Sequence, residues 1–290
     1  MAMKREQSKE VNLNLVERGT MEACLLGTTP IVLNRMSNKA RQQLLLPSGR
    51  KTEAEKKSSL KHDPLQEYRA SAYTDKSPDG PTVLQIIAAG VKLAMASIPL
   101  DLPDTGTSKA QLERLLFATE DRVPLYGVPR MLISVTRNSD MNHTPDIRTR
   151  AIVPRWAAKV AITYVKPVLR MDVVEKLLAA AGFMRGIGDW RPEKGSGNYG
   201  CFEIVQPDDP RFLFVIENGG RGAQVAALET PDFYDDETAE MFAWFLAEKD
   251  RKGFVKTDEA TDEKGGNGKA KKGRSRSHTE TEVEVEVMDD

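Results

Sequence analysis

The spacing of apolar residues predicts strands and helices that alternate over most of the chain. Runs of branched apolar side chains predict strands at Met21–Leu33, Met131–Thr136, Trp156–Val165 and Tyr199–Val205. Two shorter apolar runs, Phe212–Glu217 and Gln224–Leu228, flank a turn sequence, Asn218-Gly219-Gly220. This arrangement predicts a β-hairpin.

Apolar residues three and four positions apart predict the helices. The clearest is Met171–Ala181, which begins with acidic side chains and is followed by Gly182, a residue type that commonly ends helices. The same spacing predicts helices at Lys39–Leu46, Thr82–Ala96, Lys109–Ala118 and Thr238–Glu248, and a helical turn at Pro64–Tyr73. The expected capping residues are Ser37, Ser108 and either Asp235 or Asp236. Arg137–Ile147 is predicted to be a polar loop.

These elements predict an α+β fold in one main domain. We expect a flexible segment at residues 1–18, a single α+β domain at 19–252 with a mobile basic loop at 48–63, and a disordered segment at 253–290. The last segment is a basic linker followed by an acidic tip of alternating Glu and Val, which buries too little apolar surface to fold alone. The tip either recruits a partner protein or is a neutral solubility tail.

Composition excludes several classes of protein. The chain has 290 residues, of which 40% are hydrophobic, and no apolar run is long enough to span a membrane. The polar N-terminus lacks a secretory signal, and the only two cysteines, Cys24 and Cys201, lie too far apart in sequence for a disulfide scaffold. We therefore expect a protein of a reducing, cytoplasmic compartment.

Charge is distributed unevenly although the formal net charge is only -1. Arg35–Arg69 contains nine basic and four acidic residues, and Asp121–Lys194 contains thirteen basic and seven acidic residues. Glu203–Glu263 reverses the balance, with six basic and sixteen acidic residues. The chain can thus present a basic face that attracts phosphate backbones, although such runs are also ordinary solvated surfaces.

The segment Gly186–Gly200 combines glycines with cations and aromatic rings. It lacks the Gly-Lys-Ser/Thr of a P-loop, and it lacks the third glycine and the following helix of a dinucleotide fingerprint. Glycines let backbone N–H groups approach an anion, arginines pair with phosphates, and aromatic rings stack on unpaired bases. This combination favours single-stranded nucleic acid as the ligand. The alternative is a surface loop in which Trp190 covers the core.

Two segments supply the candidate nucleic-acid-binding residues. The glycine-rich segment would hold phosphates with its cations and stack bases on its rings; its candidates are Arg185, Gly186, Gly188, Trp190, Arg191, Lys194, Gly195, Gly197 and Tyr199. The basic loop would close over the strand with Lys51, Lys56, Lys57 and Lys61.

The polar residues form no persuasive catalytic pair. The histidines, His62, His143 and His278, are too scattered to suggest a catalytic or metal cluster. An acidic cluster could hold Mg²⁺, although acidic residues at a helix N-terminus explain its spacing more simply; its members are Asp232, Asp235, Asp236, Glu237 and Glu240. We expect no catalysis, no cofactor and no metal.

Three parts of the sequence resemble a family of largely uncharacterised tailed-phage and prophage proteins. They are Thr29-Pro30-Ile31 with Arg35–Ala40, Asp63-Pro64 with Glu67–Ser71, and Ala180–Phe183 with Gly186–Lys194. The resemblance covers roughly residues 20 to 205, and its last part is the most specific. It implies the cytoplasm of a bacterial host as the location of the protein.

The order of elements is also similar to the RAMP superfamily, the ferredoxin-like RNA-binding subunits of CRISPR effector complexes. The shared features are an early first strand, a late β-α-β unit and a glycine-rich loop after its helix. This resemblance implies a ferredoxin-like, RAMP/RRM-like β-α-β core with insertions, in which helices pack on an antiparallel sheet. It also places the loop glycines near phosphates, including Gly200.

Together these observations predict a non-catalytic phage or prophage protein that binds single-stranded DNA or RNA with little sequence preference. Several copies would assemble side by side along the strand, in replication, recombination or RNA handling. The opposed basic and acidic faces favour such head-to-tail contacts. Two alternatives stay open: an accessory module that acts on a host protein, and a metal-dependent nuclease that uses the acidic cluster.

Overall fold

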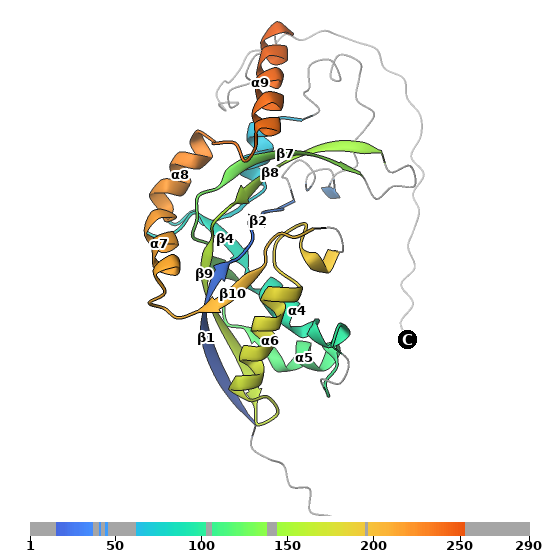
Figure 1. Cartoon of the computed structure of the whole chain (residues 1–290), viewed down its shortest axis with the longest axis vertical. Helices are drawn as coiled ribbons and strands as arrows, with labels where there is room; N and C mark the ends of the chain where they lie inside the picture. The colour runs from blue at the N-terminus through green and yellow to red at the C-terminus, as the bar shows by residue number, and fades with distance from the viewer. Residues whose placement is uncertain are drawn as a thin grey trace, which may run out of the picture.

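The computed structural model describes residues 16–36, 62–102, 106–137, 144–194 and 197–252, together with Arg41, Leu44 and Leu45. It is a mixed fold of helices and antiparallel sheets (Figure 1). Of the helix predicted at Lys39–Leu46, only those three single residues are described, and they are helical. The predicted basic loop lies outside the described residues except for His62 and Asp63, and the predicted tail lies wholly outside them.

Four strands form the large sheet, in the order β10-β1-β9-β5 with every neighbouring pair antiparallel. Their bounds are β1 Glu17–Gly27, β5 Leu116–Ala118, β9 Ala157–Lys166 and β10 Phe202–Val205. In chain order these are the fourth, first, third and second strands, so helical segments connect the first to the second and the third to the fourth.

Helices cover the two faces of the large sheet unequally. α4 (Ala88–Ala96) and α6 (Met171–Met184) pack on one face, with α5 (Lys109–Leu115) beside α4 (Figure 1). α7 (Pro210–Asn218) packs on the other face at one end, and α8 (Arg221–Glu229) follows it. The core lies on the first face, because alternate residues of β1 and β9 are buried there.

A second sheet, the hairpin sheet, has the order β2-β8-β7. Its strands are β2 Ile31–Val32, β7 Arg130–Arg137 and β8 Pro145–Val153. Its inner face joins the main core, and α3 (Pro64–Ala70) and α9 (Asp236–Arg251) pack against it. A small third sheet contains β3 Tyr73–Thr74, β4 Leu84–Ile87 and β6 Arg122–Pro124, and the 3-10 helices are η1 Ile98–Leu100 and η2 Pro192–Lys194.

The predicted hairpin at Phe212–Glu217 and Gln224–Leu228 is wrong, because these residues form α7 and α8. Asp209 caps α7 by accepting the Arg211 N–H, and Pro210 occupies the first turn, where a missing N–H costs nothing. The Gly219-Gly220 pair joins two helices instead of two strands. Apolar runs this short fit both the helical and the strand period, so the Asp209-Pro210 capping sequence indicated the correct structure better than the period did.

Several predicted boundaries also move. The helix predicted at Thr82–Ala96 begins only at Ala88, because the preceding residues pair as β4, and the helix predicted at Lys109–Ala118 ends at Leu115, where β5 begins. α6 continues past Gly182 to Met184, and part of the predicted polar loop Arg137–Ile147 belongs to β7 and β8.

Other predictions are confirmed. Met131–Thr136 lies inside β7, and Trp156–Val165 corresponds to β9. Ser108 caps α5 with a reciprocal capping box, and Asp235 caps α9.

Candidate nucleic-acid interface

The glycine-rich loop folds back onto the edge of the hairpin sheet. Gly186, Gly188 and Gly200 have positive φ angles of 65°, 85° and 76°. The N–H of Asp189 donates to the Val32 carbonyl at 2.9 Å, and the N–H of Gly200 donates to the Pro30 carbonyl at 2.8 Å. The loop is therefore held to β2 and to the turn before it by backbone hydrogen bonds.

Close backbone approach explains two of the predicted glycines. A Cβ on Gly200 would overlap the Ile187 carbonyl, and a Cβ on Gly197 would overlap the Trp190 carbonyl. The Tyr199 N–H donates to that same Trp190 carbonyl at 3.2 Å. These glycines close the loop on itself, which brings its two aromatic residues together.

Three aromatic rings gather on the outer face of the hairpin sheet. The centroids of Trp190 and Tyr199 lie 6.1 Å apart at 50°. Both rings, with Tyr234 from the segment before α9, are partly buried against Val32, Leu132 and Ile152. We call these three rings the aromatic cluster. Burial, and to a smaller degree the neighbouring Tyr199, raises the pKa of the Tyr234 hydroxyl.

Arg150 of β8 lies beneath the aromatic cluster. Its guanidinium carbon is 4.7 Å from the centroid of the Trp190 ring, and its Nη1 forms an ion pair with Asp189. Asn34 donates to the same carboxylate at 3.1 Å. Burial lowers the pKa of Arg150, and the charge of Asp189 opposes that shift. The sequence analysis missed Arg150, since its only signal is its position in a strand that was not predicted.

The two predicted loop arginines differ in position. Arg191 donates to the Glu193 carboxylate at 2.7 Å and to the Gly188 carbonyl at 2.9 Å, and it is partly exposed. Arg185 is buried, where it pairs with Asp101 and donates to the Ser97 carbonyl at 3.0 Å. Arg185 therefore joins α6 to the segment around η1, and its guanidinium is directed into the fold.

The remaining predicted residues are only partly placed. Lys194 ends η2, within the glycine-rich segment. Gly195 and the lysines of the basic loop, Lys51, Lys56, Lys57 and Lys61, lie outside the described residues, so their predicted roles stay predictions.

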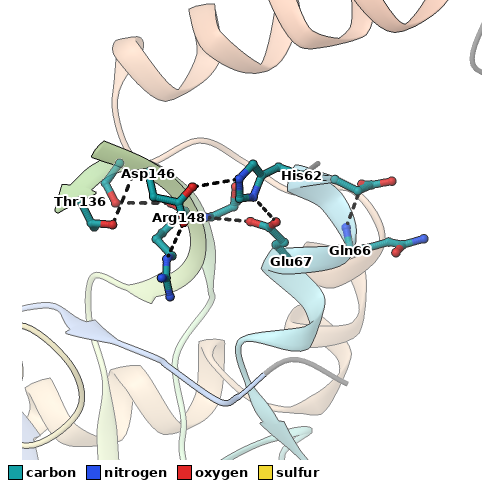
Figure 2. Close-up of polar contacts among 9 residues, drawn as sticks. His62, Gln66, Glu67, Thr136, Asp146 and Arg148 are labelled. Atoms are coloured by element: carbon teal, nitrogen blue, oxygen red, sulfur yellow. Dashed lines mark hydrogen bonds and ion pairs between the residues drawn. The ribbon is translucent and has the colours of Figure 1, made fainter. Parts of the chain in front are cut away.

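A polar cluster of one histidine and two carboxylates, which the sequence did not predict, joins α3 to the hairpin sheet (Figure 2). His62 lies between two carboxylates: its Nδ1 is 2.7 Å from Glu67 and its Nε2 is 3.1 Å from Asp146, a residue 84 positions away in the sequence. Arg148 pairs with Asp146 at 3.5 Å, and Glu67 also accepts the Thr149 N–H. These contacts hold the end of the hairpin against α3.

The acidic cluster is dispersed into local contacts. Asp235 caps α9 by accepting the Thr238 N–H at 2.8 Å, and Asp232 pairs with Arg130 at 3.2 Å. Within the described ranges, no group of three or more His, Cys, Asp or Glu residues could hold a metal ion. Among the same residues, no helix is long and apolar enough to cross a bilayer.

Comparison with known proteins gives distant likenesses. No family model matches the chain, and no curated protein matches its sequence. A chain in the "Cryo-EM structure of the Type III-B Cmr-beta bound to cognate target RNA" is similar with a TM-score of 0.32 and 16% identity, over 65% of this chain and 59% of that chain. Cmr6 from Pyrococcus furiosus is similar with a TM-score of 0.30 and 9% identity, over 65% of this chain and 98% of that chain.

These structural neighbours can be set beside the two resemblances seen in the sequence, one to phage proteins and one to the RAMP superfamily. Both neighbours are named for Cmr proteins, and no family model or curated relative supports the resemblance to phage proteins. The TM-scores are too low to carry a functional argument.

Proposed function

We propose that the protein binds single-stranded nucleic acid through the aromatic cluster and the arginines around it. The observation that carries the proposal is the gathering of Trp190, Tyr199 and Tyr234 over Arg150 on one outer sheet face. Partly exposed rings accept stacked bases without sequence preference, and a buried guanidinium beneath one ring fixes its orientation.

Exposed arginines border this face. Arg130 and Arg148 have side chains that are 45% and 47% exposed; Arg130 pairs with the exposed Asp232, and Arg148 pairs with the partly buried Asp146. Exposed ion pairs contribute at most about 1 kcal/mol, so at Arg130 a phosphate can replace the carboxylate at little cost. Backbone contacts from such arginines would hold the strand while bases stack on the rings.

The proposal extends to the fold. The chain order of the large sheet, fourth-first-third-second with two helical connections, is the arrangement of a ferredoxin-like β-α-β-β-α-β core. The hairpin sheet, the small sheet and the last three helices would then be additions to that core. We further propose that the protein has no catalytic activity, is cytoplasmic and comes from a phage or prophage. In this proposal several copies assemble side by side, and the acidic tail recruits a partner.

Fluorescence anisotropy with labelled single-stranded DNA, single-stranded RNA and duplex tests this function. We expect Trp190→Ala to weaken single-strand binding about 5- to 160-fold, because stacking contributes about 1–3 kcal/mol per base. Trp190→Phe keeps a ring and should retain most of the affinity. Trp244→Ala is the matched control, since Trp244 is 66% exposed on α9, outside the aromatic cluster.

Two outcomes would overturn the proposal. One is a wild-type protein that binds none of the three ligands at low salt. The other is binding that Trp190→Ala and Trp244→Ala leave equally intact in folded protein. Deletion of residues 253–290 distinguishes nucleic-acid binding from the alternative of a protein-interaction module. The alternative predicts that the deletion abolishes function, whereas the loop variants do not.

A further inference from the structure

The face of the large sheet opposite α6 is only partly covered. α7 covers it at one end, where Phe212 and Val215 pack against Cys24 and Leu26. Past α7, toward the start of β1, Figure 1 shows no helix on this side of the sheet. The outward residues of this part of β1 are exposed, namely Arg18, Thr20 and Glu22. We call this part of the sheet the open face.

A row of hydroxyl groups crosses the open face. Thr20 of β1 lies opposite Thr163 of β9, which lies opposite Phe117 of β5. The Thr163 hydroxyl is 3.2 Å from that of Thr20 and 3.1 Å from that of Thr119. Each hydroxyl has one proton, and the two bonds of the row use two of the three protons, so one hydroxyl can still donate to an incoming anionic oxygen.

Two cations lie over the Phe117 ring beside this row, and a third lies four residues farther along β9. The guanidinium carbon of Arg18 is 5.3 Å from the centroid of the Phe117 ring, and the Lys92 ammonium is 5.6 Å from the same centroid. Lys159 lies opposite Cys24 on β9. Burial raises the pKa of the Cys24 thiol, and the positive charge of Lys159 partly opposes that shift.

None of these cations pairs with a carboxylate in the part of the chain that the structure describes. Glu22 is exposed in the same stretch of β1. Arg18 lies opposite Val165, six residues along β9 from Lys159, so the two cations are spaced by about 20 Å along the strands at about 3.3 Å per residue. One small anion cannot neutralise both, whereas a polyanion can.

We propose that the open face binds the phosphodiester backbone of single-stranded nucleic acid, as a second contact area separate from the aromatic cluster. This inference depends on the proposed function, because it assigns a further surface to the same ligand. Arg18, Lys92 and Lys159 neutralise phosphates at separate points along the strand, one threonine hydroxyl donates to a phosphate oxygen, and the Phe117 ring contacts a base.

The salt dependence of binding tests the inference. Each phosphate contact contributes about 0.7 to the slope of log affinity against log salt for a single strand, so Arg18→Gln with Lys159→Gln should reduce that slope by about 1.4. At about 50 mM salt the same double variant should bind about tenfold more weakly. Phe117→Leu keeps the apolar volume but loses the ring, and a photoreactive uridine in the oligonucleotide should crosslink to Phe117 in the wild type.

Arg114→Gln with Lys176→Gln is the matched control. It removes the same charge from two exposed residues of α5 and α6, on the side of the sheet that the helices cover. Thermal unfolding of each variant separates loss of contact from loss of folding.

The outcomes distinguish failure of this inference from failure of the proposed function. Absence of any oligonucleotide binding by the wild type overturns both. The open-face assignment alone is overturned if the two double variants change the slope of log affinity against log salt equally and no crosslink forms at Phe117. If polyglutamate displaces the oligonucleotide at equal charge concentration, the face binds acidic peptides and the nucleic-acid assignment is wrong.

Discussion

The aromatic cluster and the open face use cations in opposite ways. Around the cluster, Arg150 is paired with Asp189 and Arg191 with Glu193, and both pairs lie within or beneath the loop. On the open face, Arg18 and Lys92 lie over a phenylalanine ring with no carboxylate partner among the described residues. Paired, partly buried arginines determine the shape of a surface, whereas unpaired exposed cations determine its potential.

This difference suggests a division of roles. The loop has little free positive charge, so it would contribute geometry and stacking once a strand is bound. The open face has free charge and a regular strand backbone, so it would contribute long-range attraction that salt weakens. Three predictions test the contrast, and they differ in the size of the expected effect.

The largest effect is expected from removing a buried counter-ion. Asp189→Ala leaves Arg150, whose side chain is 9% exposed, without its carboxylate, and should lower the free energy of unfolding by about 3 kcal/mol. Glu22→Ala on the open face should change it by less than about 0.5 kcal/mol. Urea unfolding followed by circular dichroism measures both. Equal effects of the two substitutions would contradict the contrast.

A smaller loss of unfolding free energy is expected from adding a side chain to the glycine-rich loop. Gly200 has a φ of 76° and its Cβ would overlap a backbone carbonyl, so Gly200→Ala should lower the free energy of unfolding by about 2 kcal/mol. Thr20→Val, in the regular strand of the open face, should cost less than about 1 kcal/mol. The same urea experiment compares them, and a Gly200→Ala protein as stable as wild type would show that the loop is not held as described.

The smallest effect is expected from releasing a paired arginine. Glu193→Gln removes the carboxylate that holds Arg191 and should raise affinity for single-stranded nucleic acid about threefold at low salt, because a pair that solvent still partly screens contributes about 0.5–1 kcal/mol. Glu229→Gln removes an equal charge from exposed α8 and is the control. Anisotropy titration measures the change. An affinity that falls, or that rises equally in the control, would show that Arg191 does not contact the ligand.

Local patterns predicted the long elements well. The 11 residues of β1 and the 10 residues of β9 show alternation or branched runs, and the 14 residues of α6 show helical spacing, so their neighbours in sequence suffice to identify them. α7 and α8 have only nine residues each, too few for the period to decide, and both were predicted as strands. The capping pair Asp209-Pro210 was the available signal that would have corrected them.

The candidate interface was predictable only in part. Trp190 and Tyr199 lie in one glycine-rich segment, so the sequence could bring them together. Arg150 and Tyr234 come from distant segments, and only the packing of the loop on β2 and β8 places them beside that pair. The partner of Arg191 lies two residues away and was visible in the sequence, whereas the Asp101 partner of the buried Arg185 was not.

By itself, the sequence determined the α+β class, strands β1, β7, β9 and β10 and the glycine-rich loop with its aromatic pair, because each depends on residues close together in the chain. Tertiary structure alone decided which cations are neutralised and which remain free. Charges are identified by residue type, but their pairing depends on strand register and on contacts between distant segments. For that reason the open face, assembled from β1, β5 and β9 with one lysine from α4, had no signature in the sequence.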